Sequence, residues 1–265
     1  MIWTPDQVLE QSRLWVSPWY PPNSTHVVAD GYELYIVGSE ATLMAYRGEL
    51  QDRAEITDGA VKVAADHRAT SLRVTVGPDE PGAEPALPEL SMATDITVVA
   101  TIDILAMDRD GFDSRHTSTP TDVEVIEVRT YDQVAEYETT SALAWSYPPP
   151  TADSIQSAHE RLKPGSFLAY SAGTPSGTGG YTRAGDVARF WGAAVVAGQR
   201  GHGVYRSLVA ARLDNAFAQG VTLAIVHAEP TSSPILQRLG FNKFGHQHTF
   251  AIRIEPTLQP PWSVL

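Results

Sequence analysis

A glycine-rich turn between an apolar strand and a helix constrains this sequence more than any other feature. Residues 187–196 have the apolar pattern of a strand, glycines follow at positions 198, 201 and 203, and residues 204–219 have a helical pattern that ends at Gly220. The first backbone N–H groups of a helix lack partners within it and lie at the positive end of its dipole. The turn is therefore a candidate phosphate or pyrophosphate site, although a tight turn at an ordinary α/β junction has the same pattern.

Composition limits the partners that such a site can serve. The chain has 265 residues, with 31 acidic and 19 basic side chains and a formal net charge of -12. This charge repels nucleic-acid backbones and anionic lipid, so we expect neither partner. A positively charged amine is attracted by the same negative potential. The absence of cysteine excludes disulfides, thiolate metal sites and cysteine nucleophiles. Asp6 and Glu10 interrupt the N-terminal apolar residues, and the apolar stretch 96–107 is too short to cross a bilayer, so we expect a cytoplasmic protein.

A polar stretch divides the chain into two predicted parts. Residues 111–121 have a linker composition, which predicts a domain at 1–112, a linker at 113–122 and a domain at 123–265. In the first part, Thr4 and Gln7 form a predicted capping box for a helix that ends before Pro18. The other expected elements are strands 32–37 and 42–46, helix 58–67, strand 71–76, a loop at 77–88, a short helix 89–92 and strand 96–107.

The second part alternates strands and helices. Thr130 and Gln133 predict a capping box for a helix over 131–145, which the prolines at 148–150 end. The remaining expected elements are strand 123–128, helix 151–162, strands 166–171, 178–183 and 187–196, helix 204–219, strand 221–227, helix 233–239 and strand 245–254. This order predicts a mixed α+β fold.

Two motifs give the second part a family resemblance. Arg200-x-x-Gly203 lacks both the lysine of a P-loop and the three glycines of a dinucleotide fingerprint. It resembles the acyl-CoA-binding loop of the GNAT (GCN5-related) N-acetyltransferase superfamily, Gln/Arg-x-x-Gly-x-Gly/Ala, except that Tyr205 stands at the last small position and is expected to project outward. Residues 230–241, which end in Leu-Gly-Phe, resemble the family's segment after the next strand. The resemblance covers about residues 123–254.

The resemblance implies a GNAT fold, a central, mostly antiparallel mixed sheet flanked by helices. It also implies that acetyl-CoA is the cofactor and that a primary amine of a small molecule or peptide attacks the thioester directly in a ternary complex. The alternative is a non-catalytic acyl-CoA-binding or sensor module; O-acetylation would need a stronger base than the sequence displays. The implied cofactor-binding residues are Val195, Val196, Ala197, Gln199, Arg200, Gly201, His202, Gly203, Val204, Tyr205, Arg206, Ser232 and Ser233.

The acid and base are less well defined by the resemblance. The family's tyrosine, four residues before the glycine of Leu-Gly-Phe, is replaced here by Leu236, and Glu229 stands where an asparagine is frequent. His227 and Glu229 are candidates to relay the amine proton, and Tyr205 and Ser232 are candidate proton donors. For His227 and Glu229 the sequence favours the plainer explanation of a strand-end or loop residue. Tyr205 and Ser232 are equally well explained as a helix-surface residue and a helix cap.

Aromatic side chains mark a candidate acceptor site. Trp145 and Tyr147 lie beside the proline stop, and Trp191 lies on the strand before the glycine turn; they are candidate substrate-binding residues through cation–π contact, or else core residues. His246 and His248 share a strand face, but without a third ligand they predict no metal site.

The first part has features of a degenerate GNAT-like repeat. Its strand 71–76 resembles residues 223–226, and the order of its elements repeats that of the second part after its third strand; an unrelated α+β domain would explain these short matches equally well. It has no glycine-rich turn, and Glu49, Asp52 and Glu55 would repel a pyrophosphate. We therefore expect it to complete the acceptor cleft or stabilise the fold, and not to bind CoA.

Overall fold

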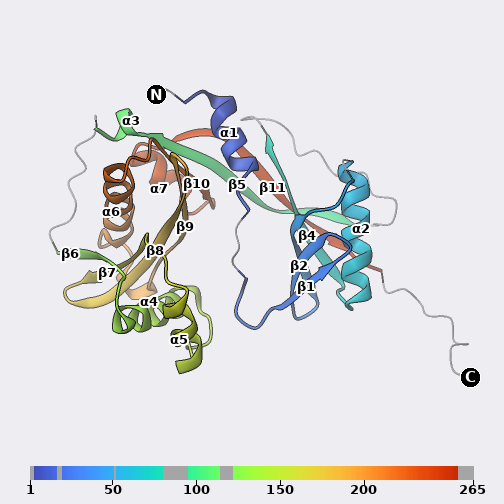
Figure 1. Cartoon of the computed structure of the whole chain (residues 1–265), viewed down its shortest axis with the longest axis horizontal. Coiled ribbons are helices and arrows are strands. Elements are labelled where there is room, and N and C mark those ends of the chain that lie inside the picture. The colour runs from blue at the N-terminus through green and yellow to red at the C-terminus, as the bar shows by residue number, and fades with distance from the viewer. Residues whose placement is uncertain (1–2, 17–19, 51, 80–94, 114–121, 256–265) are drawn as a thin grey trace, which may run out of the picture. The chain divides into compact units, whose positions relative to one another are not determined.

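The computed structural model describes residues 3–16, 20–50, 52–79, 95–113 and 122–255. The chain divides into two compact units (Figure 1). The first unit contains Met1–Ser12 and Asp103–Phe244, and the second contains Arg13–Ile102 and Gly245–Leu265. Neither unit is contiguous in sequence, so their borders differ from the predicted division at 113–122. The reason is that strands β5 (Ile96–Asp108) and β11 (Asn242–Arg253) each contribute residues to both units.

The first unit contains a mixed sheet with helices. Its strands follow the order β5-β10-β9-β8-β7-β6, and neighbouring strands are antiparallel except for the parallel pair β9 and β10. Its other elements are α1 (Pro5–Arg13), α3 (Arg109–Asp113), β6 (Val123–Glu127), α4 (Tyr131–Trp145), α5 (Ala152–Glu160), β7 (Ser166–Ser171), β8 (Thr174–Ala184), β9 (Val187–Val195), a 3₁₀ turn (Ala197–Gln199), α6 (Val204–Ala218), β10 (Leu223–Ala228) and α7 (Ser233–Arg238).

Capping residues start the helices where the sequence predicts them. The Thr130 hydroxyl accepts a hydrogen bond from the Gln133 N–H at 3.3 Å, and the Gln133 side chain accepts one from the Thr130 N–H at 3.1 Å. Thr4 and Gln7 form the same reciprocal pair at α1. Each pair satisfies two backbone donors that the helix leaves open. The predicted capping boxes are confirmed.

Helix α6 packs closely against the sheet of the first unit. Val204, Leu208 and Leu213 are buried in one hydrophobic cluster with strand residues such as Phe190. A Cβ atom added to Gly177 of β8 would lie 2.9 Å from Val204 Cγ1 and 3.1 Å from a Leu208 methyl carbon. Only glycine permits this close approach, because a Cβ atom in a protein is normally farther than this from its neighbours. The start of α6, where the glycine turn lies, is therefore held firmly against the sheet.

The second unit repeats the order of the first on a smaller scale. Three antiparallel strands, β1 (Thr25–Ala29), β2 (Tyr32–Val37) and β3 (Glu40–Tyr46), precede helix α2 (Arg53–Asp66) and strand β4 (Ser71–Asp79). β4 pairs in parallel with β3 and antiparallel with β11. The same order, three antiparallel strands followed by a helix and a parallel strand, connects β7, β8, β9, α6 and β10. The second unit is thus a GNAT-like repeat in its fold.

Three predictions for the second unit need correction. β1 was not expected, since its alternation is only five residues long. Helix α2 begins at Arg53, before the predicted position 58, because Asp52 caps it. Residues 77–79 continue β4 and are not part of the predicted loop. The predicted helix at 89–92 and most of the linker lie outside the described residues. Within the described part of the chain, no helix is long and apolar enough to cross a membrane.

Candidate functional site

Strands β9 and β10 pair over a short distance and then separate. Their parallel register joins Val187–Phe190 to Leu223–Val226 and ends there. On the other side of β9, the pairing with β8 shifts register between Thr178 and Gly180, and Gly192 has a φ of 64°. This bulge bends β9 at the place where its pairing with β10 ends. Residues 191–195 thereby leave a strand edge beside which an extended ligand can lie.

The glycine turn follows directly after this edge. Gly201 and Gly203 have φ angles of 85° and 84°, a left-handed conformation that glycine adopts without strain. Gly203 is the N-cap of α6, and it supplies no side-chain hydrogen bond to the helix. The first turn of α6 contains no acidic residue. The first N–H groups of α6 are therefore free of a side-chain cap and available to an anion.

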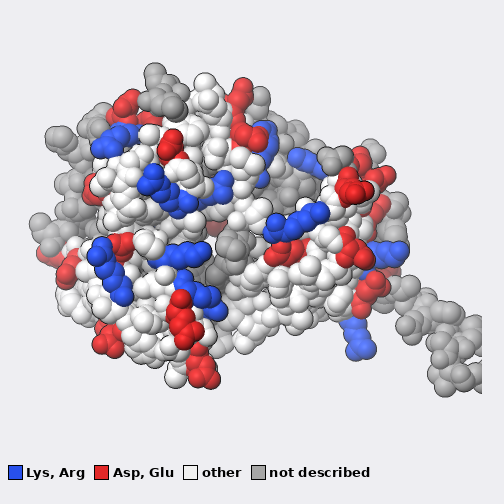
Figure 2. All heavy atoms as spheres, viewed as in Figure 1, with Lys and Arg blue, Asp and Glu red and all other residues white. Residues whose placement is uncertain are grey.

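Basic side chains accompany this helix start. Arg200, His202 and Arg206 are exposed, and Arg200 donates through Nε to the Val195 carbonyl oxygen at 3.2 Å. Arg200 is thus held beside the end of β9. Figure 2 shows Lys and Arg side chains gathered in a band across the part of the view that holds the first unit, although the chain as a whole is acidic. The turn combines open backbone donors with local positive charge, as a pyrophosphate requires.

Tyr205 does not project outward as predicted. It packs against the core cluster of the first unit, and its hydroxyl lies near the side chain of Ser232, the N-cap of α7. Ser232 in turn donates to the Glu229 carbonyl oxygen at 3.1 Å. Burial raises the pKa of Tyr205, while the positive charge of Arg212 and the nearby Ser232 hydroxyl oppose the rise. The outward orientation fails because an aromatic ring at this position gains more from burial than from solvent. Its hydroxyl therefore lies close to the start of α7, which follows the second of the two diverging strands.

Arg212 is a buried cation that sequence reasoning missed. It is 2% exposed, and it donates to the carbonyl oxygens of Leu208 and Gly180 at 3.0 and 3.2 Å. Its guanidinium lies 4.6 Å from the centre of the Phe190 ring. Burial lowers its pKa to about 10, which still leaves it charged at neutral pH. The only signal in the sequence is an arginine four residues after Leu208, on the apolar face of α6.

His227 and Glu229 occupy different surroundings at the end of β10. The His227 Nε2 atom lies 2.8 Å from the Ser12 hydroxyl of α1, and burial followed by the nearby charge of Arg189 lowers the pKa of His227 to about 4. His227 is therefore neutral at pH 7 and a weak base. The Glu229 side chain is exposed. Ser12 was not predicted, because it is distant in sequence from His227.

Ser233 is committed to a structural contact. It is 2% exposed, and its hydroxyl donates to Asp103 Oδ2 at 2.6 Å and accepts from Gln237 Nε2 at 2.9 Å. Lys243 completes this group with a 2.6 Å ion pair to Asp103. The Ser233 side chain is thus engaged within the protein, and the predicted cofactor contact of Ser233 stays a prediction. The Ser233 hydroxyl points inward because it donates to Asp103. Asp103 lies on β5, 130 residues away in the sequence, so this contact could not be predicted.

The three candidate acceptor aromatics lie on two elements. Trp145 is 46% exposed at the end of α4, and Tyr147 follows it, donating from its N–H to the Ala142 carbonyl oxygen at 2.8 Å. Trp191 of β9 covers Gly180, where a Cβ atom would lie 2.5 Å from its ring, and donates through Nε1 to Thr182 Oγ1 at 2.9 Å. Trp191 is thus fixed on the sheet, whereas Trp145 is open to solvent. His246 and His248 lie in the second unit with ring centres 4.7 Å apart.

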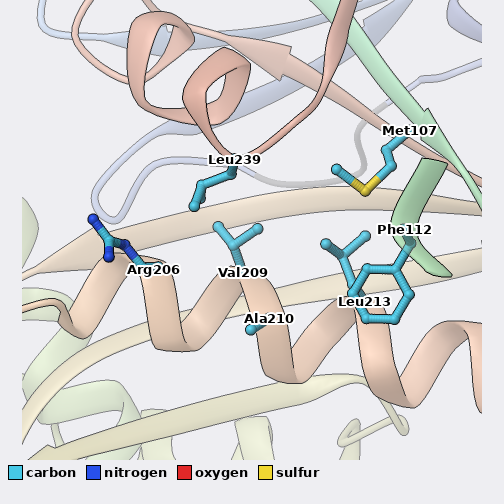
Figure 3. A pocket seen from close by; sticks show the side chains of 7 residues that line it. All are labelled: Met107, Phe112, Arg206, Val209, Ala210, Leu213 and Leu239. Atoms are coloured by element: carbon cyan, nitrogen blue, oxygen red, sulfur yellow. The ribbon is translucent and has the colours of Figure 1, made fainter. Parts of the chain in front are cut away.

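A small apolar hollow lies beside α6 (Figure 3). Its walls come from α6, the end of β5, α3 and the residue that follows α7. In Figure 3 the side chains of Val209, Leu213, Met107 and Leu239 approach one another, and Arg206 stands at one end. Since Arg206 is the only charged residue in the lining, the hollow offers no acid or base for chemistry. Its full lining is Met107, Phe112, Arg206, Val209, Ala210, Leu213 and Leu239.

Comparison with known families identifies the second part of the chain. Residues 130–241 match the model of the acetyltransferase (GNAT) family, and they include the diverging strands, the glycine turn and α7. This region of the chain is therefore similar to the GNAT acetyltransferase family. A comparison with curated protein sequences found no significant match.

Solved structures show the same fold over most of the chain. A tandem GNAT protein from the clavulanic acid biosynthesis pathway has a TM-score of 0.63 at 15% identity, over 90% of this chain and 86% of that one. GCN5-related N-acetyltransferases from Sphaerobacter thermophilus and Kribbella flavida have TM-scores of 0.60 and 0.55 at 16% and 19% identity. They cover 87% and 86% of this chain, and 79% and 89% of their own. The GNAT fold with a second, GNAT-like unit is thereby shown.

Proposed function

We propose that this protein is an acetyl-CoA-dependent N-acetyltransferase that acts on a primary amine of a small molecule or peptide. The observation that carries the proposal is the start of α6, where two left-handed glycines and an uncapped helix follow the end of β9. In this arrangement the pyrophosphate of acetyl-CoA binds the N–H groups of α6 beside Arg200 and Arg206. The pantetheine arm then extends along the free edge of β9.

The reaction is a direct transfer between the two bound substrates. The amine nitrogen attacks the thioester carbonyl carbon, the carbon–sulfur bond breaks, and CoA leaves as a thiol after it gains one proton. Backbone N–H groups of β9 after the bulge stabilise the developing negative charge on the carbonyl oxygen. One proton must be removed from the amine, and one must be delivered to sulfur.

Tyr205 is the side chain we propose for protonating the sulfur. Leu236, where many relatives have a tyrosine, is 1% exposed in the core and has no proton to give. The Tyr205 hydroxyl, which lies near Ser232 at the start of α7, supplies a phenol from a different helix. Because burial keeps it protonated at neutral pH, it can donate to a thiolate. The nearby charge of Arg212 stabilises the phenolate that results.

Glu229 is the side chain we propose for receiving the amine proton. Its exposed carboxylate follows directly after β10 and can pass a proton to solvent. The low pKa of His227 makes it unsuited to hold the proton of an amine, so its part is to orient groups as a neutral imidazole.

The test measures binding and turnover separately. Calorimetry with acetyl-CoA reports the cofactor, and thiol release with a panel of amines reports transfer. We expect Tyr205→Phe to lower kcat by about 10- to 100-fold at unchanged affinity for acetyl-CoA, as the loss of a general acid does. Tyr170→Phe is the matched control, since the Tyr170 hydroxyl is bonded to Glu136 and lies on β7. Equal activity of the two variants would remove Tyr205 from the mechanism.

A non-catalytic acyl-CoA-binding module is the second candidate. The replacement of the family's tyrosine by the buried Leu236 favours it. Tight binding of acetyl-CoA without amine-dependent thiol release would establish this alternative and overturn the enzymatic proposal. Absence of acetyl-CoA binding would overturn both.

A further inference from the structure

Arg189 lies on the sheet face that also carries His227. It belongs to β9, and the parallel register places it beside Ile225 of β10. Neighbours in register point to the same side of a sheet, and so do residues two apart on one strand. Ile225, His227, Arg189 and Trp191 therefore point to one face. The effect of Arg189 on the pKa of His227 agrees with this placement.

The guanidinium of Arg189 is incompletely satisfied by the protein. Its Nε atom is buried and has no hydrogen-bond partner among the described residues. Its Nη2 atom lies 3.5 Å from the Gln11 carbonyl oxygen at the end of α1, which is long for a hydrogen bond. The α1 carbonyls supply only the partial negative charge of a helix C-terminus. On one edge of the guanidinium, Nε thus lacks a partner and Nη2 has only this long contact.

No carboxylate of the described residues compensates for the burial of this charge. The pKa of Arg189 is lowered, and burial is the cause. A nearby Asp or Glu would oppose that shift, as an opposite charge favours the charged form. Arg212 shows how this fold satisfies a buried arginine by its own means, with two carbonyl oxygens at 3.0 and 3.2 Å and an aromatic ring. Arg189 has no comparable set of acceptors, so the edge of its guanidinium that contains Nε is suited to an external anion.

We propose that Arg189 binds a carboxylate of the acceptor, so that the acceptors are amino acids or peptides and not simple amines. This inference rests on the proposed N-acetyltransferase function. The edge of a guanidinium matches a carboxylate with two parallel hydrogen bonds. Arg189 precedes the bulge at Gly192 by three residues, or about 10 Å along a strand. The skeleton of an amino acid can span the distance that remains after the arginine side chain, and its amine then lies where the strands diverge.

The experiment compares acceptors that differ only in the carboxylate. Thiol release is measured at saturating acetyl-CoA with lysine and cadaverine, with ornithine and putrescine, and with a panel of amino acids and their amides. We expect kcat/KM to favour the carboxylate-bearing member by at least about tenfold, the value of one charge-assisted pair. Arg189→Met should reduce this ratio to near one without changing the affinity for acetyl-CoA. Arg189→Lys should keep part of the preference, since it retains the charge and loses the bidentate geometry.

The control is Arg183→Met, which removes an exposed arginine of β8 that donates to the Gly185 and Gln219 carbonyl oxygens. This variant should keep the wild-type ratio. Equal rates for acids and amines in the wild type, or a preference that survives Arg189→Met, would overturn the assignment.

A binding readout separates this inference from the proposed function. Calorimetry of the CoA-loaded protein with N-acetyl amino acids and with the matching N-acetyl amides requires no turnover. Carboxylate-dependent binding that disappears in Arg189→Met supports the inference even if no acceptor is acetylated, in which case only the enzymatic proposal fails. Binding of acids and amides alike would overturn the inference while leaving acetyl transfer in place.

Discussion

The two units begin their central helices in opposite ways. Helix α6 follows two left-handed glycines, and its N-cap, Gly203, supplies no side-chain hydrogen bond. Helix α2, at the same place in the repeated order, is capped by Asp52, whose carboxylate accepts from the Glu55 N–H at 3.0 Å. Glu55 adds a second negative charge in the first turn of α2.

This difference shows how a repeated fold can divide its tasks. A helix start attracts negative charge, and the protein can supply that charge itself or leave the place to a ligand. In the second unit the carboxylate of Asp52 permanently caps the start of α2 and stabilises the helix. In the first unit the place is left open, with Arg200 and Arg206 beside it. A few residues at one helix start thus determine which unit we expect to bind an anionic cofactor.

The largest expected effect comes from closing the open helix start. Gly203→Glu places a carboxylate at the N-terminus of α6 and forces a side chain into a left-handed conformation. We expect acetyl-CoA affinity to fall by more than about 1,000-fold, while the backbone strain costs about 1–2 kcal/mol of stability. Calorimetry and far-UV circular dichroism on the same sample provide the measurement.

Gly38→Glu is the control, because Gly38 also has a positive φ, 62°, and open space around its Cβ position, but lies in the second unit. It should cost similar stability and leave affinity unchanged. A folded Gly203→Glu protein that binds acetyl-CoA normally would refute the assignment of the loop.

The next effect concerns the acid sensitivity of the first unit. His227 has a pKa of about 4 when folded, against an ordinary value of 6.5 for histidine. Between these values the unfolded chain binds the proton more readily, so stability falls as pH drops from 6.5 to 4 and does not depend on this group above 6.5. The full loss is about 3 kcal/mol. Thermal melting from pH 7 to 4.5 should show the decline, and His227→Gln should flatten it; an unchanged slope would contradict the role of His227.

A smaller effect distinguishes two arginines, one from each unit. Arg200→Ala should weaken acetyl-CoA binding about tenfold, because it removes one charge-assisted contact to phosphate. Arg47→Ala should leave binding unchanged, since Arg47 pairs with Glu33 at 3.0 Å. Titrations at two salt concentrations should show a weaker salt dependence for Arg200→Ala only. Equal losses in the two variants would break the comparison between the units.

The smallest effect comes from opening the closed helix start. Asp52→Ala removes the cap of α2 and should lower the free energy of unfolding by about 1 kcal/mol. Denaturant titration measures this loss, and acetyl-CoA affinity should stay at the wild-type value. A second acetyl-CoA site in this variant would mean that Asp52 alone prevents binding in the second unit.

Local patterns allowed much of the fold and the loop to be predicted. The bounds of α4 and the start of α6 follow from caps and glycines a few residues apart, so a short window of sequence contains them. The partners of the site residues, in contrast, lie far away in the sequence and cannot be found in a short window. Ser12 meets His227 across 215 residues, and Ser233 meets Asp103 across 130. Such pairs depend on the tertiary fold, and the same is true of the inward direction of Tyr205 and of the unsatisfied edge of Arg189.

The interleaving of the two units affects the order in which they can form during synthesis. Helix α1 is synthesised well before its partners, since Trp3 bonds to Thr222 and Ser12 to His227. The second unit is also incomplete until β11 has been synthesised, since β4 pairs with β11. Until β10 and β11 have been translated, β9 and β4 lack their later partner strands, and their edges must be kept from foreign strands. We therefore expect nascent chains that lack β11 to depend on chaperones, since late pairing delays closure of the core.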